Sequence, residues 1–120
     1  MVILVVDDSQ SITACLKDAL ERAGHTVYTA STMRAAMDSL ERLPIQAVIC
    51  DGQIPSYDVS QPAVVWGPDI TQFARKSGMR AVLFSAREDL VEAERQVGGV
   101  AVLKPGKGIG KLLDLLDGQP

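Results

Sequence analysis

The sequence has little of what marks a metal-thiolate protein or a nucleic-acid-binding protein. It holds only two cysteines in 120 residues, Cys15 and Cys50, and their spacing is not that of a zinc site. Each falls in an apolar pattern, so we expect two buried thiols in a reducing compartment. The twelve Lys and Arg are scattered and the net charge is −3, which argues against the basic surface that a phosphate backbone requires. The sequence therefore predicts no direct nucleic-acid partner.

Long apolar runs are also missing. No stretch reaches the roughly 20 residues that a helix needs to cross a bilayer. Met1 leads directly into a short apolar run, with no basic leader segment or cleavage site. We therefore expect no membrane span and a cytoplasmic location. With 47% apolar residues the chain can bury one core, so we expect a single domain over residues 1–120, and any second domain would lie outside this sequence.

What the chain does have is a regular alternation of short apolar runs and amphipathic segments. Five runs are typical of strands: 2–6, 26–30, 47–50, 81–84 and 100–103. Five segments carry apolar residues at helical spacing: 9–23, 31–43, 69–76, 87–97 and from 107 onward. Units of this length join parallel strands through right-handed crossovers. We predict an α/β fold with a five-stranded parallel sheet, doubly wound into a three-layer sandwich.

Some helix details can also be predicted. Ser9 and Ser31 stand where N-caps are expected, before the first and second helical patterns. The fourth helix has the weakest amphipathic pattern, and its inward stripe is predicted to be Leu90, Ala93 and Val97.

Polar side chains stand at the C-terminal ends of four predicted strands. The first strand runs into Asp7-Asp8, the third into Asp51, the fourth into Ser85 and the fifth into Lys104. Ligands of open α/β sheets bind at that edge, where the strand order reverses. Three carboxylates in one place repel one another, and a hard divalent cation with oxygen ligands is the usual remedy. We therefore expect Mg²⁺ there, with the hydroxyl and the ammonium available to a phosphoryl group.

This set of motifs resembles the receiver domain of response regulators in two-component signalling. The family pattern has an acidic pair after the first strand and Asp-x-x-hydrophobic-Pro after the third. Ser or Thr with a small residue follows the fourth strand, and Lys-Pro follows the fifth. The matching segments, in order and across almost the whole chain, are Asp7-Asp8, Asp51-Gly52-Gln53-Ile54-Pro55, Ser85-Ala86 and Lys104-Pro105. One such motif is weak, whereas four at these spacings are specific, and they imply the CheY-like, flavodoxin-like fold.

The resemblance implies a function for each acidic residue. Asp51 would accept a phosphoryl group from a phosphohistidine, carried by a sensor histidine kinase or a phosphotransfer protein. Mg²⁺ would be held by Asp8, by the Asp51 carboxylate and by the backbone carbonyl of Gln53, with Asp7 acting through water. The chain would then be a signalling module and not an enzyme, and its output would be an unknown partner or effector domain.

The resemblance also covers the groups around the phosphoryl site. Ser85 and Lys104 would contact the phosphoryl oxygens, and the peptide between Lys104 and Pro105 is often cis in this family. The side chains of Gln53 and Arg87 would flank the path of attacking water. Arg87 is long enough to cover the phosphoryl group, so we expect it to slow hydrolysis.

Three departures from the family pattern concern signal output. Ala101 stands where the family has its switch aromatic, and Gly106 stands where Phe is common. The segment 56–67 is longer than usual and carries Tyr57 and Trp66. A ring cannot rotate at Ala101, so we expect the long segment to form a loop with a hydrophobic face that alters a partner surface.

Other interpretations stay open at this point. A receiver-like interaction domain that signals without phosphorylation is compatible with the missing aromatic. A Mg²⁺-dependent phosphohydrolase of the haloacid dehalogenase type needs Asp-x-Asp after the first strand, and Asp7-Asp8-Ser9 has a different spacing. The polar residues could also be structural, with the acidic pair at a helix start, Ser85 as a helix cap and Lys104 on the surface.

Overall fold

The computed structural model describes residues 1–104 and 108–116. In these ranges the strands are β1 (Val2–Val6), β2 (Thr26–Ala30), β3 (Ala47–Cys50), β4 (Arg80–Ser85) and β5 (Val100–Leu103). The helices are α1 (Gln10–Arg22), α2 (Met33–Arg42), α3 (Gly67–Lys76), α4 (Glu88–Gln96) and α5 (Gly108–Leu116). The expectations for Pro105, for Gly106 and for a helix start at Lys107 lie outside the described residues.

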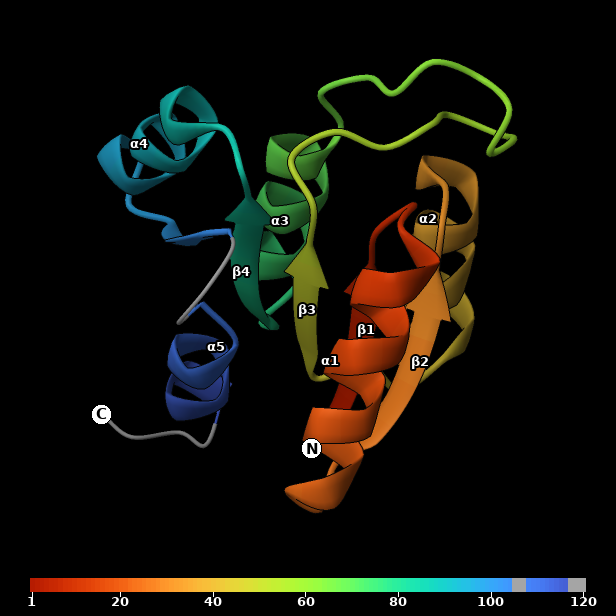
Figure 1. Cartoon of the computed structure of the whole chain (residues 1–120), viewed down its shortest axis with the longest axis vertical. Coiled ribbons are helices and arrows are strands. Elements are labelled where there is room, and N and C mark those ends of the chain that lie inside the picture. Colours follow the sequence, from red (N-terminus) through yellow and green to blue (C-terminus); the bar gives the residue numbers. More distant parts are fainter. Residues whose placement is uncertain (105–107, 117–120) are drawn as a thin grey trace.

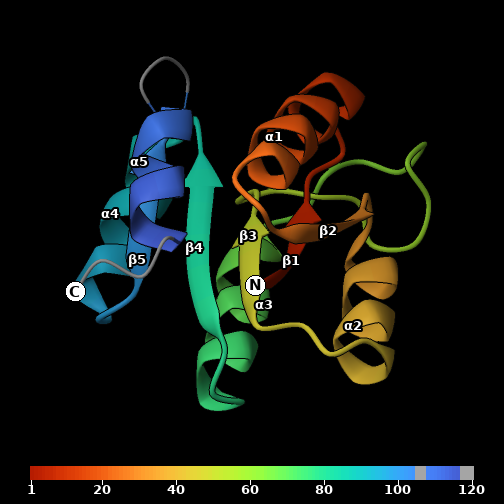
Figure 2. The same ribbon diagram turned by 90° about the horizontal axis from the view of Figure 1, so that it is seen from below.

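The strands form one parallel sheet in the order β2-β1-β3-β4-β5. Helices α1 and α5 pack on one face, and α2, α3 and α4 pack on the other (Figures 1 and 2). The predicted doubly wound, three-layer α/β fold is confirmed. The chain winds to one side of β1 first and then to the other, so the strand order reverses between β1 and β3. Their C-terminal ends flank the crevice where this fold binds ligands.

The central strands are apolar throughout because helices cover both of their faces. In β3, Ala47 and Ile49 belong to the core cluster under α1 and α5, and Val48 and Cys50 belong to the cluster under α2 and α3. All four are buried. This explains the continuous apolar run without polar alternation. Asp51 is the first residue beyond it, at the point where the strand leaves the core.

The start of α1 is as predicted, whereas the start of α2 is not. The Ser9 hydroxyl accepts a hydrogen bond from the Ile12 N–H, at 3.4 Å. In α2 the N-cap is Thr32 and not Ser31, because the Thr32 hydroxyl accepts the Ala35 N–H at 3.1 Å. Both candidates are good cap residues, so the sequence could not rank them.

Helix α3 begins at Gly67, two residues before the predicted start near Asp69, and Pro68 stands in its first turn, where proline is favourable. One further expectation is wrong. Cys15 is exposed, whereas Cys50 is buried as expected. Leu16 lies on the buried face of α1, and its neighbour Cys15 therefore lies on the face that meets solvent.

The inward stripe of α4 also differs from the prediction. Val91 and Glu94 are buried, whereas Ala93 and Val97 are exposed, Val97 to 72%. The carboxylate of Glu94 lies 2.7 Å from the Thr71 hydroxyl and 2.6 Å from Arg75 Nη1, both on α3. A charged residue can be buried when such partners replace water. A pattern of apolar residues cannot reveal partners 19 and 23 positions away.

None of the helices in the described ranges has the length and hydropathy of a transmembrane segment.

The buried pair between α3 and α4 gives a stability prediction. Arg75→Met should lower the free energy of unfolding by about 2–3 kcal/mol, because it leaves the Glu94 carboxylate buried with only one donor. Urea titration measures this. Arg22→Met is the matched control, since its ion pair with Asp18 is solvent-exposed, and it should cost less than about 0.5 kcal/mol. Equal losses in the two variants would contradict the prediction.

Candidate functional site

The acidic site is built by the ends of two neighbouring strands. Val6 and Cys50 are paired in the β1–β3 register, and the Asp51 N–H donates to the Val6 carbonyl at 2.8 Å. The Asp7 N–H donates to the Ala30 carbonyl of β2 at 3.0 Å. These ladder bonds fix the backbone from which the carboxylates project. Oxygens of Asp7, Asp8 and Asp51 lie within 4.8 Å of one another, so the structure brings the predicted acidic residues together.

Lys104 is part of this cluster and not a surface lysine. Its backbone N–H donates to the Ser85 carbonyl at 2.9 Å, so Lys104 lies beside the C-terminal end of β4. Its Nζ lies 2.6 Å from Asp7 Oδ2 and 3.5 Å from Asp51 Oδ1, and it stands over the Phe84 ring. The side chain is only 13% exposed. The ammonium therefore offsets part of the repulsion between the two carboxylates.

The charge on Asp51 remains only partly balanced. Burial, and after it the nearby charge of Asp7, raise the pKa of its carboxyl from 3.8 to about 6. Lys104 and the Gly52 N–H lower this pKa but do not restore the ordinary value of 3.8. The ionised carboxylate is thus held where an added positive charge would stabilise it.

The two residues of the acidic pair have different surroundings. Asp7 is 3% exposed, and both of its oxygens have partners: Oδ1 accepts the Ser9 N–H at 2.9 Å and Oδ2 pairs with Lys104. Asp7 thus has a role at the helix start as well as in the cluster. Asp8, in contrast, is exposed to solvent. Three carboxylates with oxygen donors are the ligand type that Mg²⁺ prefers, so the residues present fit this ion.

Ser85 is buried beside the acidic cluster. Its hydroxyl accepts the Arg87 N–H at 3.1 Å, and Arg87, not Ser85, is the N-cap of α4. Gly52 allows the close approach of this hydroxyl, because a Cβ at position 52 would lie 2.8 Å from Ser85 Oγ and 2.7 Å from Leu90 Cδ1. The serine is therefore not the helix cap, and its side chain packs against the residue after Asp51.

Sequence reasoning missed the packing role of Gly67. Its N–H donates to the Gly52 carbonyl at 3.1 Å, and a Cβ at position 67 would collide with the Asp51 carbonyl oxygen and lie 2.7 Å from the Gly52 Cα. The start of α3 can therefore pack directly on the backbone of the site. The only signal in the sequence was a glycine before Pro68 at the end of the long segment.

Gln53 lies two residues beyond Asp51 and is half-buried. The next residue, Ile54, pairs with Val64 in an antiparallel bridge. Gln53 is thus held between the strand end and this bridge. The proposed use of its backbone carbonyl as a metal ligand stays a prediction.

The comparisons with known proteins agree with this arrangement. The family model of the response regulator receiver domain matches residues 3–104. The chain belongs to this family. No curated protein sequence gives a significant match.

Solved structures give the same fold for this receiver domain. The chemotaxis response regulator CheY4 of Vibrio cholerae has a TM-score of 0.76 and 22% identity, covering 97% of this chain and 95% of the other. The response regulator TrrA of Thermotoga maritima, solved with Mg²⁺-BeF, has a TM-score of 0.76 and 20% identity, covering 97% and 96%. A receiver domain from Francisella has a TM-score of 0.75 and 20% identity, covering 97% and 93%. At this identity the likeness concerns the fold.

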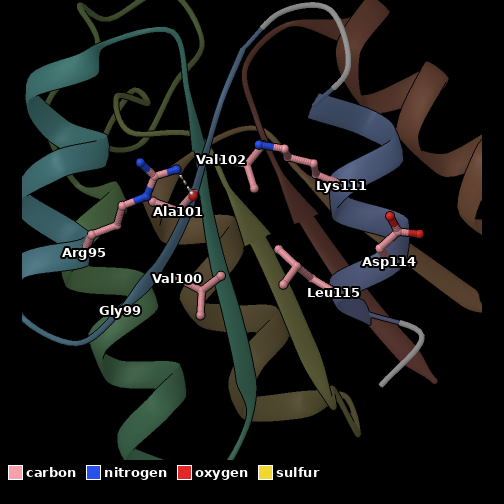
Figure 3. Close-up of a pocket in the computed structure, with 8 residues that line it drawn as sticks. All are labelled: Arg95, Gly99, Val100, Ala101, Val102, Lys111, Asp114 and Leu115. Atoms are coloured by element: carbon pink, nitrogen blue, oxygen red, sulfur yellow. Dashed lines mark hydrogen bonds between the residues drawn. The ribbon is translucent and has the colours of Figure 1, made fainter. Parts of the chain in front are cut away.

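The receiver domain differs from the family pattern at Ala101. This residue is buried against Leu83 and Val91, and its carbonyl accepts a hydrogen bond from Arg95 Nη2 at 3.0 Å (Figure 3). Beside it, a groove of about 400 Å³ runs along β5 between α4 and α5 (Figure 3). Neither α4 nor β5 carries an aromatic residue, so no ring is available to rotate where these two elements meet.

The long segment between β3 and α3 is anchored at its base. It arches over the end of the sheet on the side of α2 (Figure 1). Ile54 and Val64 exchange backbone hydrogen bonds at 3.0 and 2.9 Å. The Met33 and Arg34 N–H groups, at the start of α2, donate to the carbonyls of Pro55 and Ser56. The loop is thus tied both to itself and to α2.

The tip of this loop exposes apolar side chains, as expected. Tyr57 and Val59 are each 62% exposed, and the Arg34 guanidinium lies 5.8 Å from the centre of the Tyr57 ring. Trp66 behaves differently, because it is half-buried against the core and its Nε1 donates to Ser56 Oγ at 2.9 Å. Tyr57 is therefore the more accessible of the two expected surface aromatics.

Close packing at Gly67 gives the first prediction for the site. Gly67→Ala should lower the free energy of unfolding by about 1–3 kcal/mol, because the new Cβ would overpack against the Asp51 carbonyl. Gly110→Ala in α5 is the control, since a Cβ there meets nothing within 4 Å and alanine favours a helix. Thermal unfolding of both variants measures the effect. An unchanged midpoint for Gly67→Ala would show that the contact can relax.

The raised pKa of Asp51 gives a second prediction. Between the ordinary value of 3.8 and about 6 the folded protein holds a proton that the unfolded chain releases, so rising pH removes stability across this window. Without divalent cations, Asp51→Asn should therefore stabilise the fold at pH 7.5 by about 1–2 kcal/mol, less than the full shift because the site is partly hydrated.

The gain should disappear near pH 4, where the parent carboxyl is largely protonated in the folded state. Denaturant titrations at the two pH values measure it. Asp69→Asn, at an exposed position in the first turn of α3, is the control and should give no gain. A gain of the same size at both pH values would contradict the electrostatic explanation.

Proposed function

We propose that this receiver domain accepts a phosphoryl group on Asp51 from the phosphohistidine of a sensor histidine kinase or a phosphotransfer protein. The observation that supports this most is the convergence of charges at the switch point of the sheet. A partly buried Asp51 carboxylate has a raised pKa and lies 3.5 Å from the Lys104 ammonium. The buried Ser85 hydroxyl stands beside Gly52.

The transfer would proceed by direct attack of the Asp51 carboxylate. One of its oxygens forms a bond to phosphorus while the bond from phosphorus to the imidazole nitrogen breaks. The electron pair stays on that nitrogen, and the product is an acyl phosphate on Asp51. Lys104 would pair with the phosphoryl oxygens and Ser85 would donate a hydrogen bond to them, which stabilises the charge that they carry.

Mg²⁺ is the cofactor that we propose for this step. Asp8, Asp51 and the backbone carbonyl of Gln53 would hold it. Asp7 would act through water, because both of its oxygens already have protein partners. When bound, Mg²⁺ supplies positive charge that offsets the carboxylates and the incoming phosphoryl group. The similar domain TrrA was solved with Mg²⁺-BeF, and this ligand supports the assignment.

The output would be a change in the affinity of a partner or effector domain, and the chain would act as a signalling module of the cytoplasm and not as an enzyme. Phosphorylation-independent interaction remains the alternative that Ala101 favours, since the family's ring is missing there. The phosphohydrolase alternative has lost its support, because the family match is to receiver domains.

Intact mass after incubation with Mg²⁺ and acetyl phosphate tests the proposal. The parent should gain one phosphate and Asp51→Asn should gain none, because the amide keeps the shape and lacks the nucleophilic oxygen. Asp69→Asn should behave like the parent. Phosphate uptake by Asp51→Asn at the parental rate would contradict the assignment of Asp51 as the phosphorylated residue. A parent that gains no phosphate would favour the interaction-only alternative.

A further inference from the structure

Arg87 is held by a neighbouring carboxylate. Its Nε lies 3.0 Å from Asp89 Oδ1 and its Nη2 lies 2.5 Å from Asp89 Oδ2, so the guanidinium makes a two-pronged contact. Both side chains are exposed, to 44% and 64%. The pair lies in solvent at the start of α4, within the turn that follows β4.

The same arginine is close to the phosphoryl site through its backbone. Its N–H donates to Ser85 Oγ at 3.1 Å, and that hydroxyl packs against Gly52, the residue after Asp51. Only one hydrogen bond therefore separates the Arg87 backbone from a group that would touch the phosphoryl oxygens. The side chain of arginine is long and flexible, so its guanidinium can exchange one partner for another by rotation.

The two possible partners of Arg87 compete. An exposed ion pair is weakened by water and salt, and it contributes little to stability. A phosphoryl group offers more negative charge and several acceptor oxygens in a partly buried site, which matches the planar guanidinium. Asp89 therefore holds the Arg87 guanidinium in the unphosphorylated protein, and a phosphoryl group would compete with Asp89 for it.

We propose that Asp89 is a positioning residue that withholds Arg87 from the phosphoryl group on Asp51 and thereby shortens the lifetime of the phosphorylated state. This inference rests on the proposed function. The step concerned is hydrolysis: a water oxygen bonds to phosphorus, the bond from phosphorus to the Asp51 oxygen breaks, and its electron pair stays on the carboxylate. Inorganic phosphate leaves, and the proton that the water loses passes to the solvent. Arg87 on the phosphoryl oxygens covers the path of that water.

The test is the decay of phosphorylated protein after removal of acetyl phosphate, followed by intact mass in the presence of Mg²⁺. Asp89→Asn should lengthen the half-life about two- to fivefold, the range that corresponds to loss of an exposed pair. Arg87→Ala should shorten it. The double variant should decay like Arg87→Ala alone, because Asp89 acts only through Arg87.

Glu88→Gln is the matched control, since it removes the same charge from the same turn of α4 and should leave the half-life unchanged. All three positions are on the surface, and equal rates of phosphate uptake would show that the site is intact in each of the four variants. An unchanged half-life in Asp89→Asn overturns the inference. A lengthening that persists in the Arg87→Ala background also overturns it, since that result would be a general effect of charge.

Failure of the proposed function and failure of the role of Asp89 give different results. If the parent takes up no phosphate, the proposed function fails and the role of Asp89 falls with it. If the parent is phosphorylated and all half-lives are equal, only the role of Asp89 is wrong.

Discussion

The ammonium of Lys104 between the carboxylates of Asp7 and Asp51 is the interaction on which the rest of the site depends. It joins residues at the ends of β1, β3 and β5, and 97 positions separate the lysine from Asp7. Two carboxylates this close in a partly buried crevice would repel each other if no cation lay between them. The lysine reduces that cost without removing it, because burial and, after it, the charge of Asp7 keep the pKa of Asp51 raised. The negative charge of the two carboxylates is reduced by Lys104 but not cancelled, which suits the cation and the phosphoryl group that we propose for this site.

Glycine determines how closely the surrounding elements approach this charge cluster. Gly52 allows the Ser85 hydroxyl and Leu90 to pack beside the residue after Asp51, and Gly67 allows α3 to begin directly on the Asp51 carbonyl. The site is therefore enclosed by backbone on one side and open at Asp8 on the other. Enclosure on one side accounts for the partial desolvation of Asp51, and the open side leaves its carboxylate 17% exposed and accessible from solvent.

Much of the fold and of the charge cluster could be predicted because both depend on local patterns. A strand covered on both faces is an uninterrupted apolar run, so its end is visible in the sequence, and Asp51 and Lys104 stand at such ends. What the sequence could not show depends on distant partners. Glu94 is buried only because α3 brings Thr71 and Arg75 to it. The choice of Thr32 over Ser31 as a cap, and the packing role of Gly67, likewise depend on the position of the backbone in space.

The absence of a ring at Ala101 changes which contacts can carry a signal away from Asp51. Helix α4 is tied to the site at its start, by the Ser85–Arg87 hydrogen bond and by Leu90 against Gly52. Further along, Glu94 holds it to α3 and Arg95 holds it to the Ala101 carbonyl of β5. The first tie involves groups that a phosphoryl group would engage, whereas the other two lie outside the acidic cluster. If Asp51 is phosphorylated as we propose, the change in charge would act first on the first turn of α4, while the Glu94 and Arg95 contacts hold the later turns. Reorientation of that turn, around Arg87 and Leu90, would then be the movement that replaces ring rotation in this receiver domain.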